Sequence, residues 1–324
     1  MRFSVLVVSY GRPDDLERCL RSLACQVRLP DEVILATVAT DTATDVVLER
    51  WQTSGELPGL AHIKTPEPSI LAQENLALAH ATGDVVCFID DDAEAFPDWL
   101  ANIEAHYRDS QIGAVGGPDY IYDNGQRVTG NAEVIGRVSW LGKVTGNHHL
   151  PGDRVVEVDL LKGCNMSYRW HLVPRLDPGI IGQFAHHWEL ETCLNIKRQG
   201  YSLIYDPCIR VNHYIRRSMA YREQHFVLGD YLYMINHNHL YALLKHSGSI
   251  QQLFRLLWIF LWGDYPEMGL AVFGKTCLKR LIRHGNLSFI RLLGPTLWGK
   301  MDALRVLANS RNRMLGDEAK PFGI

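Results

Sequence analysis

Hydrophobic residues run almost without interruption through several short segments in the first part of the chain. Phe3 to Val8 and Val33 to Val38 are apolar and rich in β-branched residues, which is typical of strands covered on both faces in a parallel sheet. Leu60 to Ile63 is a weaker segment of this kind, and Val85 to Ile89 is a fourth. The pattern therefore predicts four buried strands before Asp90.

Segments with helical spacing separate these strands. Leu16, Leu20 and Leu23 follow Pro13 at intervals of three and four residues, which places them on one face of a helix. A second helical pattern covers residues 71–81. Alternation of strands and helices is the mark of βαβ units, so we predict an α/β fold with a mostly parallel, doubly wound sheet.

The pattern changes twice further along the chain. Residues 110–185 contain short strands and glycine-rich loops, and a helix is expected over residues 188–199, followed by a strand. From residue 219 to 313 only helical patterns occur. We therefore predict an α/β domain over residues 1–215 and a C-terminal helical extension over residues 216–324.

Composition and charge narrow the class of protein. The chain has 324 residues, of which 47% are hydrophobic and 21% charged, as in a globular protein with a large core. The net charge of −3 gives no reason to expect nucleic acid as a partner. Seven cysteines without CxxC pairs argue against a disulfide framework. The first apolar stretch ends at Gly11, too early for a signal peptide, so we expect a cytoplasmic location.

The fourth predicted strand ends on three adjacent carboxylates, Asp90, Asp91 and Asp92. Such close like charges are costly unless a cation or hydrogen-bond donors compensate them. Ligands bind beyond the carboxyl ends of the strands in open sheets, and in an extended chain Asp90 and Asp92 point to the same side. The sequence thus predicts a Mg²⁺ or Mn²⁺ site. The alternative is that the acids bind loop amides and favour the N-terminus of the next helix.

Four segments together resemble the family 2 glycosyltransferases, which have the nucleotide-diphospho-sugar transferase fold, and the resemblance covers about residues 3–215. VLVVSYGRPDDLERCLRSL resembles the family's first strand and helix, and NLALAHATGDVVCFIDDDAEAFPDWL resembles the region of its Asp-x-Asp signature. KGCNMSYR resembles its acceptor-side stretch. YSLIYDPCIRVNHY resembles the strand that ends on its metal-binding histidine.

This resemblance implies a donor site for a nucleotide-diphospho-sugar with a bound divalent metal. Asp90, Asp92 and His213 would hold the metal, and Arg216 or Arg217 would close on the phosphates. Without the resemblance, His213 would be a hydrogen-bonded histidine at a strand end. The other binding residues implied are Ser9, Tyr10, Arg12, Thr37, Asn75, Asp91, Gly163, Asn165 and Trp188.

A sugar acceptor hydroxyl is a poor nucleophile, so a carboxylate is needed to take its proton. The family supplies it from a Glu-Asp pair at the start of a helix that ends near a glycine. Counted back from Gly200, this pair falls on Trp188 and Glu189. The resemblance therefore makes Glu189 the predicted catalytic base, with inversion at the anomeric carbon, and Glu191 the second choice. The alternative is that both acids only favour the helix N-terminus.

The chain departs from the family pattern at three positions. Thr37 and Val38 replace an acid that usually holds the nucleotide base, Glu74 replaces a common arginine, and Trp188 replaces the acid before the base. The first two place the usual uracil contact in doubt, and Trp188 offers an apolar face to a sugar or lipid acceptor. A catalytically inactive nucleotide- or sugar-binding protein is therefore the alternative to an active transferase.

The C-terminal region is basic and rich in large apolar residues. Its apolar stretch from Leu256 to Trp262 is much shorter than the ~20 residues that a membrane span needs. Nine basic residues and one acid, Asp302, lie between Lys275 and Arg313. This composition suits either an anionic membrane surface or a solvated helical cap. We expect a transferase that adds sugar to a saccharide or lipid-linked saccharide in cell-surface polysaccharide or glycolipid synthesis.

Overall fold

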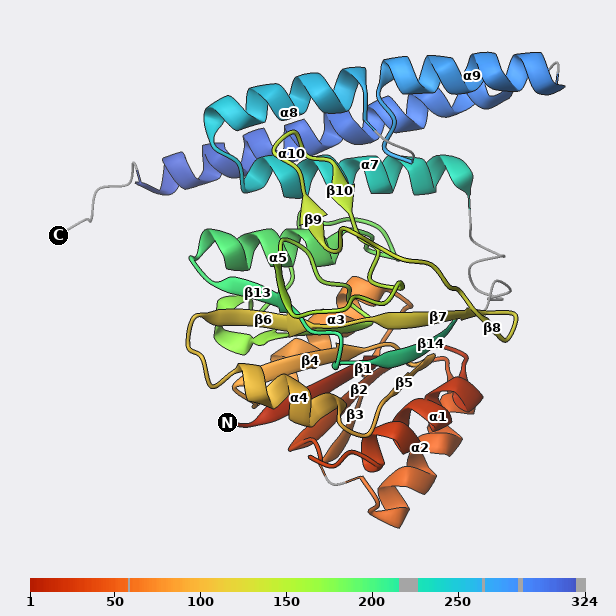
Figure 1. Ribbon diagram of the computed structural model, residues 1–324, viewed down its shortest axis with the longest axis vertical. Coiled ribbons are helices and arrows are strands. Elements are labelled where there is room, and N and C mark those ends of the chain that lie inside the picture. Colours follow the sequence, from red (N-terminus) through yellow and green to blue (C-terminus); the bar gives the residue numbers. More distant parts are fainter. Residues whose placement is uncertain (58, 216–226, 264–265, 285–287, 319–324) are drawn as a thin grey trace. The chain divides into compact units, whose positions relative to one another are not determined.

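The computed structural model describes residues 1–57, 59–215, 227–263, 266–284 and 288–318 (Figure 1). The chain divides into two compact units, which we call the sheet unit and the helical unit. The predicted boundary at residue 216 lies outside the described residues. Two earlier segments, 139–143 and 177–191, belong to the helical unit. The sheet unit contains residues 1–138, 144–176 and 192–219, and the helical unit contains residues 139–143, 177–191 and 220–324.

An eight-stranded sheet forms the centre of the sheet unit, in the order β11-β13-β6-β12-β4-β1-β2-β3. The strands β1 to β4 are parallel, as predicted, whereas β12 runs antiparallel between β4 and β6. The strands are β1 (Phe3–Val8), β2 (Glu32–Val38), β3 (Leu60–Thr65), β4 (Val85–Ile89), β6 (Ile112–Gly116), β11 (Val156–Val158), β12 (Asn165–Arg169) and β13 (Ser202–Tyr205).

Helices pack on this sheet and complete its core. Leu16, Leu20 and Leu23 of α1 are fully buried with the apolar residues of β1 and β2, so the predicted helical face is confirmed. The α/β fold follows from this alternation of strands and helices. The helices are α1 (Pro13–Ala24), α2 (Thr42–Ser54), α3 (Ile70–His80), α4 (Trp99–His106) and α5 (Trp188–Arg198), with the 3₁₀ turn η1 (Trp170–Leu172).

A second, four-stranded sheet was not predicted. The segment read as one strand after α5 is split at Asp206, where a turn closes with a bond from the Ile209 amide to the Asp206 carbonyl oxygen of 3.1 Å. Pro207 lies in this turn and has no N–H to donate to a ladder. The second half therefore joins another sheet, in the order β5-β14-β7-β8. The bounds are β5 (Ala93–Ala95), β7 (Asp119–Asp123), β8 (Gln126–Arg127) and β14 (Val211–Ile215), and a separate pair is β9 (Arg137–Val138) with β10 (Val144–Thr145).

The described part of the helical unit after residue 226 is helical, as predicted. The helix α7 packs along α10, and α8 contacts both α7 and α9 (Figure 1). Among the described residues, no helix combines the length and the apolar character that a membrane span requires. The elements are α7 (Leu228–Lys245), α8 (Ser249–Leu261), α9 (Leu270–His284), η2 (Ser288–Leu292) and α10 (Leu293–Glu318).

Lys300 of α10 is completely buried in the helical unit. Its ammonium group donates to the carbonyl oxygens of Ile259, Glu267 and Met268, at 3.0, 3.1 and 2.7 Å. We expect Lys300→Met to lower the free energy of unfolding by about 2 to 5 kcal/mol, because three buried carbonyl groups lose their donor. Urea unfolding measures this loss. The exposed Lys275→Met is the control, and an equal effect of the two substitutions would contradict the prediction.

Candidate active site

The three carboxylates at the end of β4 lie on a turn. The Ala93 amide donates to the Asp90 carbonyl oxygen at 3.0 Å, so the chain lacks here the extended conformation that the expected alternation of side chains assumed. Asp90 and Asp92 nevertheless both lie near Nε2 of His213. The Asp90 side chain is 42% exposed, whereas those of Asp91 and Asp92 are 1% and 7% exposed. The turn thus buries two of the three charges and leaves one open to a ligand.

Arg12, in the turn between β1 and α1, compensates the two buried acids. Its guanidinium lies 2.8 Å from an Asp91 oxygen and 2.6 Å from an Asp92 oxygen. Burial raises the pKa of Asp91 to about 7 against the opposing charge of Arg12. Burial also acts on Asp92, but a hydrogen bond with His213 and the Arg12 charge outweigh it and lower its pKa to about 2. Asp92 is therefore ionised at neutral pH.

His213 of β14 lies between acids from two other segments. Its Nε2 atom is 3.2 Å from Asp92 and 3.7 Å from Asp90, and its Nδ1 atom is 3.3 Å from the buried Asp119 of β7. Burial lowers the pKa of His213, but its neighbours, Asp119 and Asp92 among them, outweigh this and raise it well above the usual value. Lys162 pairs with Asp119. These groups form one cluster, made of Arg12, Asp90, Asp91, Asp92, Asp119, Lys162 and His213.

The cluster has the charge and the donors that a divalent cation needs. A metal binds the ionised carboxylates and the neutral imidazole. In these protonation states the four carboxylates exceed Arg12 and Lys162 by two negative charges, which one Mg²⁺ or Mn²⁺ would neutralise. Ligating atoms of Asp90, Cys164 and His213 lie within 4.8 Å of one another. Burial raises the pKa of the Cys164 thiol to about 12, so carboxylate oxygen and imidazole nitrogen are the better ligands at neutral pH. The residues therefore fit a metal site.

The structure brings the predicted metal residues Asp90, Asp92 and His213 together, and it adds partners that the sequence reasoning missed. Asp119 lies against Nδ1 of His213 and orients the ring, which leaves Nε2 for a metal. Lys162 is the first residue of the stretch KGCNMSYR, so the match of this stretch to the family was a signal that could have identified it. Arg216 and Arg217 lie outside the described residues.

The predicted donor side contains an acid that the sequence comparison did not identify. Asp41, at the N-cap of α2, accepts a hydrogen bond from the Gly11 amide at 2.7 Å, in the turn that contains Ser9, Tyr10 and Arg12. Thr37 is buried, and its hydroxyl lies 2.7 Å from Nε2 of His62 on β3. Burial and Lys64 lower the pKa of His62, so this imidazole is neutral at pH 7.

Two predicted binding residues have structural partners. The side-chain oxygen of Asn75 accepts from the Leu176 amide at 2.8 Å. Asn165, buried next to Gly163 and Cys164, accepts from the Trp99 indole at 2.8 Å. Its amide group also donates to the carbonyl oxygens of Pro118 and Ile209, at 3.0 and 2.8 Å. Asn165 therefore fixes the segment that leads into Asp119.

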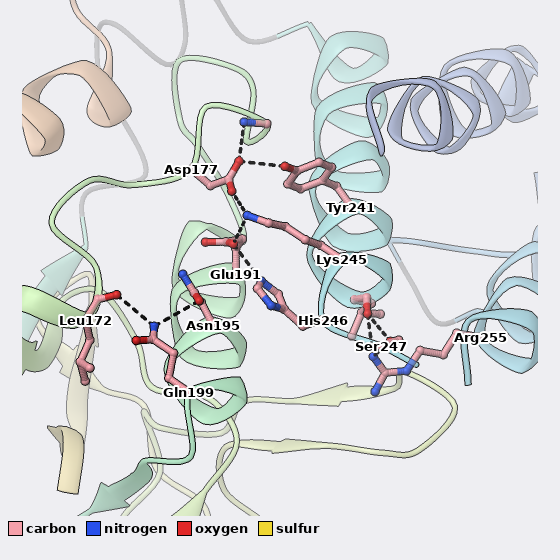
Figure 2. A network of polar contacts seen from close by, with 12 residues as sticks. Leu172, Asp177, Glu191, Asn195, Gln199, Tyr241, Lys245, His246, Ser247 and Arg255 are labelled. Atoms are coloured by element: carbon pink, nitrogen blue, oxygen red, sulfur yellow. Dashed lines mark hydrogen bonds and ion pairs between the residues drawn. The ribbon is translucent and has the colours of Figure 1, made fainter. Parts of the chain in front are cut away.

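The first residues of α5 belong to the helical unit. Glu191 is buried and accepts from Lys245 Nζ at 2.9 Å and from His246 Nε2 at 2.8 Å, both at the end of α7 (Figure 2). Trp188 is buried as well, whereas Glu189 is half-buried. Glu191 is therefore committed to an ion pair with α7.

Helix α7 also holds the loop before α5. Asn238 donates to the carbonyl oxygens of Ile181 and His186, at 3.0 and 2.8 Å, and accepts from the Ile181 amide at 2.9 Å. Ala185 and His187 have φ angles of 45° and 69°, which non-glycine residues rarely adopt. Such strained backbone persists only where the surroundings hold it. The hydrogen bonds from α7 thus fix the conformation in which α5 begins.

Comparison with solved structures finds the same fold in other proteins. A mannosyltransferase of Pyrobaculum calidifontis, solved in complex with GDP-Man and Mn²⁺, matches with a TM-score of 0.54 and 18% identity over 94% of this chain and 87% of that one. The family model of glycosyl transferase family 2 matches residues 4–171. The chain therefore belongs to this family and contains a glycosyltransferase domain.

Two curated relatives support this assignment. The succinoglycan biosynthesis protein ExoM of Rhizobium meliloti is 28% identical over 123 residues, which are 36% of this chain and 38% of ExoM. The glucosyl-dolichyl phosphate glucuronosyltransferase of Haloferax volcanii is 26% identical over 227 residues, which are 66% of this chain and 69% of that protein. The match to ExoM thus spans well under half of its length.

We expect Asp92→Asn and His213→Ala to weaken Mn²⁺ binding by at least ~10-fold, because each removes a predicted ligand. Calorimetric titration with MnCl₂ measures the affinity. Asp206→Asn is the matched control, since Asp206 forms a similar pair with His106, at 2.7 Å, away from the cluster. Equal affinities in all four proteins would exclude the proposed ligands.

Asn238→Ala removes three hydrogen bonds to the loop before α5. We expect the amides of residues 181–187 to exchange with deuterium ~10-fold faster or more, because each lost bond contributes about 0.5 to 1.5 kcal/mol. The control is Asn236→Ala, because the Asn236 amide donates to Leu232 within α7 itself, at 2.8 Å. If both variants exchange alike in this loop, Asn238 does not hold it.

Proposed function

We propose that the protein is an inverting, metal-dependent glycosyltransferase, which moves a sugar from a nucleotide-diphospho-sugar to a saccharide or lipid-linked saccharide. The observation that carries this proposal is the cluster at the end of β4. Its two excess negative charges lie beside an imidazole, at the carboxyl edge of the sheet of a family 2 domain. Ligands of open α/β sheets bind at this edge.

The residues that would hold the metal are Asp90, Asp92 and His213. A divalent ion there, Mn²⁺ or Mg²⁺, would stabilise the charge that grows on the leaving diphosphate. Arg12 and Lys162 add positive charge beside the same carboxylates, which favours the approach of an anionic donor. Arg216 and Arg217 remain proposed as further phosphate contacts.

Glu189 is the proposed catalytic base. The family pattern supports it over Glu191, because it places the base at this position of α5. Glu191 itself is paired with Lys245 and His246. Glu189 would take the proton of the acceptor hydroxyl as the oxygen attacks the anomeric carbon. Attack from the side opposite the leaving diphosphate inverts the configuration there.

The nucleotide base and the acceptor are proposed only by class. Thr37, paired with the neutral His62, stands where the family usually has an acid. In the proposed donor site, the hydroxyl of Thr37 and the imidazole of His62 contact the nucleobase in place of the usual carboxylate. The names of the two curated relatives, one in succinoglycan biosynthesis and one acting on a dolichyl phosphate-linked sugar, support cell-surface polysaccharide or glycolipid synthesis. We propose that this synthesis takes place on the cytoplasmic side of the membrane.

The test has two stages. First, thermal unfolding is followed with UDP, GDP, CDP, ADP and dTDP, with and without Mn²⁺. A ligand at 100 times its Kd stabilises the fold by about 2.7 kcal/mol, so one nucleotide should raise the Tm only with metal. Then sugar release from the matching nucleotide sugars is measured. We expect Glu189→Gln to keep the shift and to lower the rate ~100-fold or more.

The exposed Glu49→Gln is the control and should retain the full rate. If no nucleotide changes the Tm of folded protein, the donor site is not functional. If a nucleotide binds but the wild type releases sugar as slowly as Glu189→Gln does, the protein binds the nucleotide without catalysing transfer.

A further inference from the structure

Helix α8 turns its apolar side chains outward. Five of them recur at intervals of three or four residues, so they lie on one face of the helix. Each is between 44% and 73% exposed. Large apolar residues gathered on one exposed face are unusual in soluble proteins and mark an interaction surface. We call this the outer face of α8, formed by Ile250, Leu253, Phe254, Leu257 and Leu261.

The inward side of α8 carries one charged group beside the buried Ile259. Arg255 is only 5% exposed. It donates to the carbonyl oxygens of Trp140 and Leu243, at 3.1 and 2.8 Å. It also donates to the Ser247 hydroxyl at 2.7 Å (Figure 2). A rotation that buried the leucines would strip a charged guanidinium of these partners, which is costly. The outward direction of the apolar face is therefore fixed by hydrogen bonds within the helical unit.

Aromatic side chains enlarge this face. Trp140, which is exposed, packs on Phe254 with ring centroids 5.2 Å apart. Trp262, also exposed, stacks on Trp258 at 6.2 Å. Tryptophan is enriched where proteins meet the membrane–water boundary, because its ring is apolar while its N–H remains hydrated.

The charges of α8 and α9 suit an anionic partner. Neither helix contains Asp or Glu. On α9, Leu278 and Ile282 are exposed among the exposed basic residues Lys275, Lys279, Arg280 and Arg283. A soluble protein partner of such a surface needs an acidic and apolar face of its own, whereas an anionic lipid surface supplies both the negative charge and the apolar layer.

We propose that the outer face of α8 is a docking surface for an anionic membrane, with the basic residues of α9 at the lipid headgroups. The side chains of Leu, Ile and Phe enter the boundary of the acyl chains, and the Lys and Arg side chains bind phosphate groups. Both contributions are needed, because a single weak anchor gives only marginal binding. This proposal does not depend on sugar transfer, so it stands or fails separately from the catalytic assignment.

The experiment is flotation of the full chain with vesicles of phosphatidylcholine, alone or with an equal part of phosphatidylglycerol. We expect binding only to the anionic vesicles, and weaker binding in 1 M salt, where the Debye length falls to about 3 Å. The double substitution Leu253→Asp and Leu257→Asp should lower the affinity by at least ~10-fold. Replacement of Lys279 and Arg283 by Ser should lower it ~5-fold for each charge.

Val46→Asp is the matched control, because Val46 is an exposed apolar residue of α2 in the sheet unit. It should bind vesicles as the wild type does, and circular dichroism should show all variants folded. Equal binding of the double Leu variant and the control would overturn the proposal. The proposal would also be overturned if the wild-type chain bound neither kind of vesicle. A dimer seen by light scattering and dissociated by the double Leu substitution would overturn it as well, because a second copy of the chain would then cover α8.

Discussion

Charge compensation at the end of β4 is the constraint on which the rest of the sheet unit depends. Buried carboxylates are costly unless partners offset them. The partners come from separate places in the chain: Arg12 from the turn before α1, Lys162 from the segment before β12, and His213 from β14. The cluster is therefore assembled only when the antiparallel β12 and the small sheet are both in place. Fold and candidate site are thus specified together.

The sequence predicts the parts of this arrangement that depend on local patterns. The buried strands of the parallel half are continuous apolar runs, and α1 has a clear apolar face, so both are found where expected. The position of His213 among the acids was predictable only from the family resemblance. Asp119 gave no local signal, because its contact with His213 arises from the pairing of β7 with β14, which are far apart in sequence.

Other features were hidden because one local pattern fits two structures. The carboxylates after Ile89 read equally well as extended chain or as a turn, and the turn decides which of them is exposed. The strand pattern after α5 did not show that the turn at Asp206 sends its two halves into different sheets. For α8, the run LFRLLWIFL indicates a helix but not which face is outward. That direction depends on the three partners of Arg255, which lie outside the run.

Buried polar groups, together with apolar contacts, fix the described helices of the helical unit. Lys300 donates to three carbonyl groups, Arg255 to two and Asn238 to two. Each of these carbonyl groups lies outside the helix that contains its donor. Such bonds are directional, so they set orientation as well as proximity. Arg255 holds the inward side of α8 together with the buried Ile259. A helix anchored by an inward arginine can thus keep its exposed leucines for an external surface. The same kind of bond, from Asn238, holds the strained backbone that leads to Glu189.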